Sequence, residues 1–393
     1  QNLKSIILPK KITTISVGMF GICTSLCSLT FLGDINIIET SAFYNCLSLK
    51  TITIPEQVKE IPVELFYCCK NLITINLPKN LTSIKRRAFK NCLSLKEITI
   101  PEKVTYIPFE LFCGCTNLSS IILLGNITSI NHGAFKKCKS LISISLPDSI
   151  TSIGKSAFYK STNLTSINIP EKLTNISLKL FANCISLKSI AIPAKVTKIE
   201  CCCFENCVNL NSITLPKNLS LILSFAFSGC FNLKSFTIPE NIIYIDRKAF
   251  NECLNIKSII IPKKLTNISE GLFSNCISLE SITIPTNIVD IFSNAFYNCT
   301  KLKSIIFLGN ISCISSGVFM HCISLQSISI PENIFSIGDS AFHGCINLQS
   351  ILIPENVSVV YICRYLMLIT NISNMNENNR SYTINNRKYI LNK

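Results

Sequence analysis

The residues of this chain that are best suited to chemistry are its 22 cysteines, most of which recur at a fixed spacing. A cysteine stands three residues after each recurrent phenylalanine, from Cys23 to Cys345, and Ser161 is the one exception. Stacked neighbours would lie within disulfide range, but side chains that all point the same way form poor bridges. Free buried cysteine packs as a small apolar side chain. The spacing therefore predicts a column of free structural thiols.

The remaining cysteines do not repeat, and their densest group is Cys201, Cys202 and Cys203 followed by Cys207. Structural zinc sites usually pair two short Cys-x-x-Cys segments, and no such pair accompanies this group. Cys203 and Cys207 also occupy positions that face the core in other repeats. We therefore predict no metal site.

Catalytic groups are sparse in this sequence. The three histidines, His132, His321 and His343, fall at different positions of the repeat, and the aspartates are scattered. No phosphate-binding glycine loop, nucleophile elbow or HExxH motif occurs. We predict no catalytic residue, no cofactor and no enzymatic activity.

The element that positions all these residues is a repeat of 23 residues, for example Phe43 to Leu65. Within it, Leu49, Ile52 and Ile54 form a Leu-x-x-Ile-x-Ile pattern whose last part alternates as in a β-strand. Pro55 then ends the strand, because proline has no N–H to donate. The following segment predicts a second short strand or 3-10 turn that leads into a brief helix around the next phenylalanine. Such a fixed period indicates stacked repeats that bury a shared core.

The domain organisation follows from the unbroken register. We predict one solenoid of about 15 repeats over residues 1–360, and a degenerate C-terminal cap with an Asn-rich tail over residues 361–393. The tail could be a stalk, a disordered end or a last pair of strands. Three repeats replace the proline by Leu-Gly, and there we expect glycine to rebuild the exit turn at positive φ. These pairs are Leu32-Gly33, Leu124-Gly125 and Leu308-Gly309.

The outward positions of the predicted strands form columns of lysine, serine and threonine. The chain carries a net charge of +15, which suits an acidic partner but also arises where lysine merely solubilises exposed positions. Arginine, which recognises phosphate by paired hydrogen bonds, is rare in the repeats, and this disfavours nucleic acid. A solvent-exposed sheet also tolerates columns of serine and threonine that contact no ligand. The candidate ligand contacts are Lys50, Lys96, Lys188, Lys234, Lys257, Lys303, Ser189, Ser212, Ser235 and Ser258.

The repeat Leu-x-x-Ile-x-Ile-Pro-x-x-Val-x-x-Ile-x-x-x-Ala-Phe-x-x-Cys resembles that of BspA-like, or Treponema pallidum-type, leucine-rich-repeat proteins. The resemblance implies an α/β repeat solenoid, a right-handed superhelix with a parallel sheet on its concave face. Bacterial members resemble surface adhesins that bind extracellular-matrix proteins and other cells. It therefore implies a surface or secreted protein that binds host or neighbouring-cell proteins, or an acidic glycan, through the concave face.

The cellular location has two interpretations. Acceptor triplets for N-glycosylation are frequent, which suits the secretory pathway. The many apparently free cysteines instead suit a cytoplasmic scaffold for protein–protein interaction, because reducing compartments keep thiols reduced. No run of 18 apolar residues is present, so we expect no transmembrane segment.

Overall fold

The computed structural model describes residues 2–234, 236–352, 357, 359–362, 381–384 and 387–391. Its contacts divide the chain into an N-terminal unit, Gln1–Lys195, and a C-terminal unit, Val196–Lys393. Each unit is a stack of coils, and each coil contributes up to two short strands. The first strand follows the phenylalanine and cysteine of its coil, and the second precedes the next phenylalanine.

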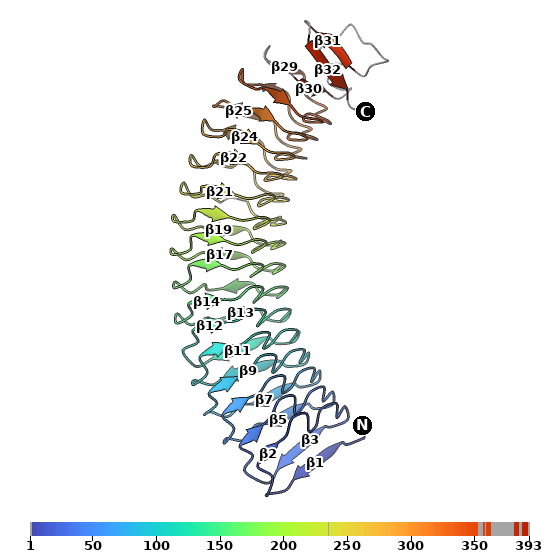
Figure 1. Cartoon of the computed structure of the whole chain (residues 1–393), viewed down its shortest axis with the longest axis vertical. Helices are drawn as coiled ribbons and strands as arrows, with labels where there is room; N and C mark the ends of the chain where they lie inside the picture. Colours follow the sequence, from blue (N-terminus) through green and yellow to red (C-terminus); the bar gives the residue numbers. More distant parts are fainter. Residues whose placement is uncertain are drawn as a thin grey trace. The chain divides into compact units, whose positions relative to one another are not determined.

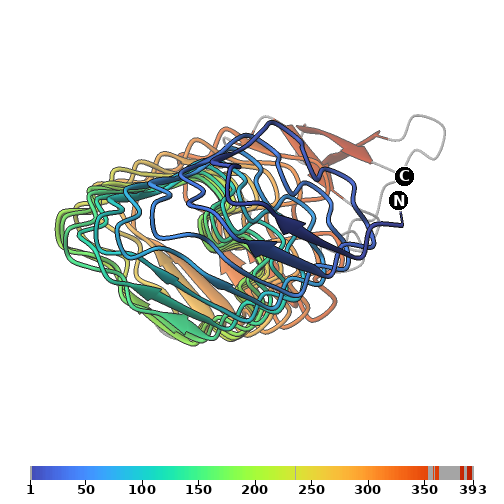
Figure 2. The same cartoon turned by 90° about the horizontal axis from the view of Figure 1, so that it is seen from below.

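In the N-terminal unit the first strands pair in parallel, for example β9 with β11 (Figure 1). Their register joins residues one repeat apart, such as Ser120 with Glu97 and Ile122 with Thr99. The second strands pair in the same way, for example β10 with β12. Figure 2 views the blue coils nearly along the stack, so that each appears as an elongated loop. The first strands are β1 (Ser5–Leu8), β3 (Ser28–Phe31), β5 (Thr51–Thr53), β7 (Thr74–Asn76), β9 (Glu97–Ile100), β11 (Ser120–Leu123), β13 (Ser143–Ile144), β15 (Ser166–Ile167) and β17 (Ser189–Ala191); the second strands are β2 (Thr14–Ile15), β4 (Ile37–Ile38), β6 (Glu60–Ile61), β8 (Ser83–Ile84), β10 (Tyr106–Ile107), β12 (Ser129–Ile130), β14 (Ser152–Ile153) and β16 (Asn175–Ile176).

The C-terminal unit repeats this plan with one interruption in its first strands. Its described residues contain no first strand between β19 and β23. In this gap Phe236 takes a position that isoleucine holds in other repeats, and its ring centroid lies 4.8 Å from that of Phe250. The interval also includes a second repeat, around Ile259, in which the usual isoleucine is present. The first strands are β19 (Ser212–Thr214), β23 (Ser281–Ile284), β25 (Ser304–Phe307), β27 (Ser327–Ser329) and β29 (Ser350–Leu352); the second strands are β18 (Lys198–Ile199), β20 (Leu221–Ile222), β21 (Tyr244–Ile245), β22 (Asn267–Ile268), β24 (Asp290–Ile291), β26 (Cys313–Ile314), β28 (Ser336–Ile337) and β30 (Val359–Ile362).

The chain after residue 360 contains a last pair of strands, which was one of the three alternatives for the tail. Strand β31 (Ser381–Ile384) pairs antiparallel with β32 (Arg387–Leu391), and β32 pairs in parallel with β30. Strand β30 in turn continues the register of the second strands, because Val359 lies opposite Ser336. The proposed boundary near residue 360 between a solenoid and a cap stays a prediction.

The brief helix predicted around each phenylalanine is absent from the described residues, which contain no helix. The segment is a pair of turns with positive φ on both sides of the phenylalanine, for example at Glu64 (φ 55°) and Cys68 (φ 59°) around Phe66. A right-handed helix cannot pass through two left-handed residues so close together. The fold is thus a β-solenoid, and the α/β expectation was wrong in its helical part. Its right-handedness and the concave position of the first strands stay predictions.

These turns form a third wall of the coil, here called the turn wall, which is bonded to the next coil. The N–H of Glu64 donates to the carbonyl of Arg86, that of Phe66 to Ala88 and that of Cys68 to Lys90, at 3.2, 2.8 and 2.8 Å. The same bonds recur from coil to coil. The left-handed residues therefore aim backbone groups along the stack rather than into a helix.

The core of each unit is a column of stacked phenylalanine rings. In the N-terminal unit consecutive rings from Phe20 to Phe181 lie 5.3–5.7 Å apart between centroids. In the C-terminal unit the rings from Phe204 to Phe342 lie 5.3–5.8 Å apart. Adjacent rings are nearly parallel, so each coil covers the aromatic face of the one before it.

The cysteine column does more than fill space beside these rings. Twelve of these thiols donate to the backbone carbonyl of the phenylalanine in the preceding coil, as from Cys69 Sγ to Phe43 O at 3.0 Å. The hydroxyl of Ser161 makes the same bond to Phe135 O at 2.9 Å, which explains why serine is accepted there. The prediction of free thiols is confirmed for eleven of the cysteines that make this bond. They are Cys46, Cys69, Cys92, Cys115, Cys138, Cys184, Cys230, Cys253, Cys276, Cys299 and Cys322.

A substitution at Ser161 separates this hydrogen bond from simple packing. Ser161→Cys keeps a donor, so we expect almost unchanged stability, whereas Ser161→Ala loses the bond and should cost about 1 kcal/mol. Thermal unfolding followed by circular dichroism measures both variants. Equal melting temperatures for the two variants would show that the bond contributes nothing.

The buried thiols also predict a loss of stability at alkaline pH. Burial raises the pKa of Cys184 and Cys276 to about 12, from an ordinary value of 9.0. Unfolded chains release these protons near pH 9, whereas the folded protein holds them, so stability falls as the pH rises from about 9 towards 12. The double variant Cys184→Ser/Cys276→Ser should show a weaker fall in melting temperature from pH 8 to pH 11. An identical pH profile for wild type and variant would contradict this assignment.

Candidate binding surface on the first strands

The outward side chains of the first strands and of the residue before each strand form an exposed surface, here called the first-strand face. Burial alternates along these strands: Ile98 and Ile100 of β9 are buried, whereas Glu97 and Thr99 are exposed. The same alternation appears in β23. The predicted period of two is confirmed for these strands, and it is what places polar residues outward.

The structure places all of the predicted contact residues that it describes at exposed positions. Lys50, Lys96, Lys188 and Ser189 lie on the first-strand face of the N-terminal unit. In the C-terminal unit Ser212 and Lys303 flank or begin first strands, while Lys234, Lys257 and Ser258 lie in the strandless interval between β19 and β23. Ser235 lies outside the described residues. Whether these residues contact a ligand stays a prediction.

The ammonium groups of these six lysines make no ion pair or hydrogen bond within the described part of the chain. The backbone carbonyls of three of them, Lys50, Lys96 and Lys257, do bond to the next coil, as in Ile73 N to Lys50 O at 2.8 Å and Glu280 N to Lys257 O at 3.0 Å. The backbone thus holds these three lysines in place while their charge stays available for another molecule.

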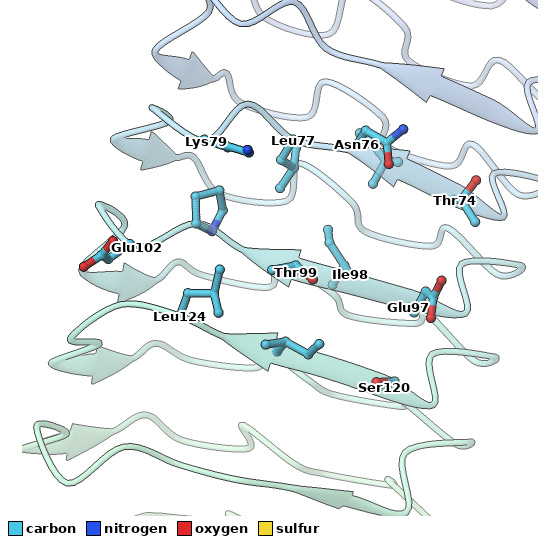
Figure 3. A pocket seen from close by; sticks show the side chains of 13 residues that line it. Thr74, Asn76, Leu77, Lys79, Glu97, Ile98, Thr99, Glu102, Ser120 and Leu124 are labelled. Carbon is cyan, nitrogen blue, oxygen red and sulfur yellow. The ribbon is translucent and has the colours of Figure 1, made fainter.

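A hollow of about 740 Å³ opens on this face over strands β7, β9 and β11 (Figure 3). Thr74 and Asn76 of β7 border it on one side, and Ser120 of β11 borders it on the other. The full lining is Thr74, Ile75, Asn76, Leu77, Lys79, Glu97, Ile98, Thr99, Pro101, Glu102, Ser120, Ile122 and Leu124. None of the ten predicted contact residues belongs to it.

The apolar edge of this hollow comes from the Leu-Gly pair that replaces proline. Leu124 keeps its N–H, which donates to Ile100 O at 3.1 Å and continues the hydrogen bonds of β9 and β11 beyond the usual proline position. Ile122 and Leu124 are 51% and 59% exposed. Gly125 is needed for a reason other than the one we expected, because its φ is not positive. A Cβ there would lie 2.2 Å from Glu102 O of the preceding coil.

The charged groups of the hollow are two carboxylates and one ammonium. Glu97 lies at the start of β9 and Glu102 just after the strand ends, at opposite sides of the hollow, and Lys79 stands one coil before Glu102 (Figure 3). Within the described residues, neither carboxylate makes an ion pair or hydrogen bond with a side chain. The hollow is therefore a locally acidic spot on a basic chain.

Sequence reasoning missed these lining residues, although two of them were visible as exceptions. Glu97 is the single acid in the hydroxyl column, and Leu124 with Gly125 interrupts the proline column. These two exceptions fall in adjacent repeats, and their closeness in the sequence is the signal that could have indicated the hollow.

A charged cluster on the turn wall has a structural explanation. Glu110 accepts hydrogen bonds from Arg87 Nε at 2.9 Å and Lys90 Nζ at 2.7 Å. Burial raises the pKa of Glu110, but the bonds from Lys90 and Arg87 outweigh it and leave the pKa below its ordinary value. The Arg87 guanidinium also lies 5.2 Å from the ring centroid of Phe109. Arg87, one of the few arginines in the repeats, is thus engaged in contacts within the protein itself.

Two further features bear on the possible activities. Among the residues that the structure describes, no group of three or more histidine, cysteine, aspartate or glutamate side chains is arranged to hold a metal ion. None of the described segments forms a helix long and apolar enough to cross a membrane.

Comparison with known proteins gives a family match over nearly the whole chain. A family described as "BspA type Leucine rich repeat region (6 copies)" matches residues 1–118, 83–210, 174–299 and 266–390. The curated proteins contain no match.

Several solved structures are similar to this chain. A leucine-rich repeat protein from Bacteroides ovatus is 28% identical with a TM-score of 0.73, over 88% of this chain and 92% of that one. The pneumococcal vaccine antigen PcpA is 20% identical with a TM-score of 0.54, over 100% and 90%. A leucine rich cell surface protein from Faecalibacterium prausnitzii is 24% identical with a TM-score of 0.49, over 95% and 92%. The first two likenesses support the solenoid fold described above.

The rim of the hollow gives a prediction about stability. Gly125→Ala forces a methyl group against the backbone of Glu102, so we expect a loss of about 1–3 kcal/mol. Leu124→Ala is the matched control, because that side chain is exposed and its loss should change stability by less than about 0.5 kcal/mol. Thermal unfolding compares the two, and equal melting temperatures would contradict the close approach.

Proposed function

Because the chain belongs to the BspA-type leucine-rich-repeat family, whose members are non-enzymatic repeat proteins, we propose that its first-strand face binds a macromolecular partner. Stacked coils carry outward residues at a regular spacing, and a long regular surface suits an extended protein or an acidic glycan better than a small molecule. The protein then acts by holding its partner, without catalysis.

The single observation that carries this proposal is the set of unpaired lysines on the first-strand face. Their ammonium groups make no ion pair within the described residues, although Glu280 stands in the same column between Lys257 and Lys303, whereas Lys85, Arg87 and Lys90 elsewhere pair with glutamates. Exposed cations without internal partners attract an acidic molecule and raise its association rate. The serine and threonine columns beside them supply hydroxyl groups for further hydrogen bonds.

The hollow over β7, β9 and β11 adds a place where one side chain of a partner is selected. Its exposed Ile122 and Leu124 offer apolar contact, and its carboxylates favour a basic group. A protein partner with both acidic and basic side chains satisfies the lysines and the hollow together. This favours a protein over a uniformly acidic glycan.

We propose a surface or secreted location for this activity. Support comes from the expectation that bacterial BspA-like proteins are surface adhesins and from the exposure of the glycosylation acceptors. In the N-terminal unit Asn80, Asn117, Asn126, Asn163 and Asn175 are all exposed. An exposed acceptor leaves room for a glycan in the folded protein.

An intracellular scaffold is the second candidate, and the thiol column favours it. The column cysteines act as hydrogen-bond donors and therefore as reduced thiols. Intact-mass analysis of protein from its natural source separates the two locations. Glycan mass that is lost on deglycosylation supports the secretory pathway, whereas bare asparagines contradict it.

A triple charge reversal tests the binding proposal. Lys188→Glu/Lys234→Glu/Lys257→Glu should weaken binding to immobilised extracellular-matrix protein, or to heparin as an acidic-glycan probe, by about tenfold or more, because each substitution replaces attraction with repulsion. The effect should shrink as salt is raised. Surface plasmon resonance at two salt concentrations measures both.

The control reverses three exposed lysines in the turns that follow the column cysteines, Lys70, Lys139 and Lys301, so that the net charge changes equally. It should bind nearly as well as the wild type. Equal weakening by both triple variants would reduce the effect to net charge, and unchanged binding by the first would exclude the first-strand face.

A further inference from the structure

The second strands of the C-terminal unit, with the residues beside them, carry several exposed apolar side chains. Ile243 and Val289, each just before a second strand, are exposed. Tyr244 and Phe292 beside them are 39% and 46% exposed. The residues that match Ile243 in the N-terminal unit include the exposed threonines Thr82, Thr105, Thr128 and Thr151. Exposed apolar residues that gather in one region mark an interaction site.

A hollow of about 480 Å³ opens between two of these aromatic side chains. Tyr244 begins β21 and Phe292 follows β24, so the two rings belong to coils that are separated by one coil. That middle coil contributes Asn267 and Ser269, whose side chains are short. The complete lining is Tyr244, Asp246, Arg247, Asn267, Ser269, Glu270, Phe292 and Ser293.

The backbone beneath this hollow is also unusual. Strand β21 is the last strand of one second-strand sheet, and β22 is the first strand of the next. The hollow thus lies where the sheet that ends at β21 gives way to the sheet that begins at β22. Its volume falls within the range of roughly 300–1,000 Å³ that is common for small-ligand sites.

Hydrogen bonds fix the tyrosine at the edge of this hollow. The Tyr244 hydroxyl donates to Asp246 Oδ1 at 3.0 Å, and the same oxygen accepts the N–H of Arg247 at 2.7 Å. The Ser224 hydroxyl donates to the other carboxylate oxygen. Burial raises the pKa of Asp246, but these bonds outweigh it and lower the pKa, so the carboxylate is charged. A side chain held in this way offers its ring to a ligand with little loss of conformational entropy.

The hollow holds one cation, Arg247, and two carboxylates, Asp246 and Glu270. Three donors already engage the Asp246 carboxylate, so the charges left to meet a ligand are Arg247 and Glu270, which are of opposite sign. A strongly anionic ligand would meet the carboxylates, and a strongly cationic one would meet the guanidinium. The lining offers two aromatic side chains, Tyr244 and Phe292, together with hydrogen-bonding groups from Asn267, Glu270 and Arg247.

We propose that this hollow is a binding site for a neutral carbohydrate of one to a few sugar units. One face of a sugar ring presents C–H bonds, which pack on the negative face of an aromatic ring. Its hydroxyls donate and accept, and therefore match an amide, a carboxylate and a guanidinium. The site lies on a different wall from the first-strand face and takes a different class of ligand, so it goes beyond the function proposed above.

The experiment is a glycan array probed with the purified full chain, followed by titration of the best neutral glycan. We expect a neutral glycan to bind at high salt, because stacking on an aromatic ring is screened little by ions. Tyr244→Ala and Phe292→Ala should each weaken this binding by about tenfold, as is usual for aromatic anchors. Tyr244→Phe keeps the ring and should retain most of it.

The control variants are Ile243→Ala and Val289→Ala, which remove exposed side chains of the same region that do not line the hollow. They should leave glycan binding unchanged, and thermal unfolding checks that every variant is folded. The proposal is overturned if no neutral glycan binds, if the bound glycan is indifferent to Tyr244→Ala and Phe292→Ala, or if only sulfated glycans bind and salt abolishes their binding.

Discussion

The solenoid depends on one backbone carbonyl in each coil, that of the recurrent phenylalanine. Phe43 O accepts the N–H of Cys46 in its own coil at 3.3 Å and the thiol of Cys69 in the next coil at 3.0 Å. The ring of the same residue stacks on the next phenylalanine at 5.5 Å. The recurrent phenylalanine therefore fixes both the turn within its own coil and the distance to the next coil. Because its carbonyl and its ring need partners in a neighbouring coil, no coil can make these contacts alone.

The outward positions are free to vary because the core is so uniform. Both units keep the same inward columns, yet they differ in what their walls expose. The first-strand face is polar and basic, with one acidic hollow at Glu97 and Glu102, whereas the second strands of the C-terminal unit expose Tyr244 and Phe292. Binding properties in this fold thus arise from substitutions at a few outward positions on a constant frame.

The features that sequence could predict are those that recur in every repeat. The 23-residue period predicts the register between coils. The two-residue alternation within each first strand predicts which residues face inward and which lysines and serines are exposed. The turns around each phenylalanine carry a signal on one side only. The residue two positions after the phenylalanine is often Asn or Gly, as at Asn45 and Gly114, whereas Glu64, Arg87 and Phe225 before it adopt positive φ although their residue types disfavour it. The hollows could not be predicted, because each depends on how bulky and short side chains alternate between neighbouring coils.

The lateral hydrogen bonds of this chain join residues at constant separations, such as 23 residues for Asn76 with Thr53 and 26 residues for Cys69 with Phe43. A pattern of this kind is unchanged when the chain is shifted by one repeat. Recombination that adds or removes whole repeats therefore preserves the register of these bonds on both sides of the junction, whereas loss of a single residue shifts the register of every bond that spans it. Such genes can change length readily in steps of one coil, and the length of the binding surface changes with them.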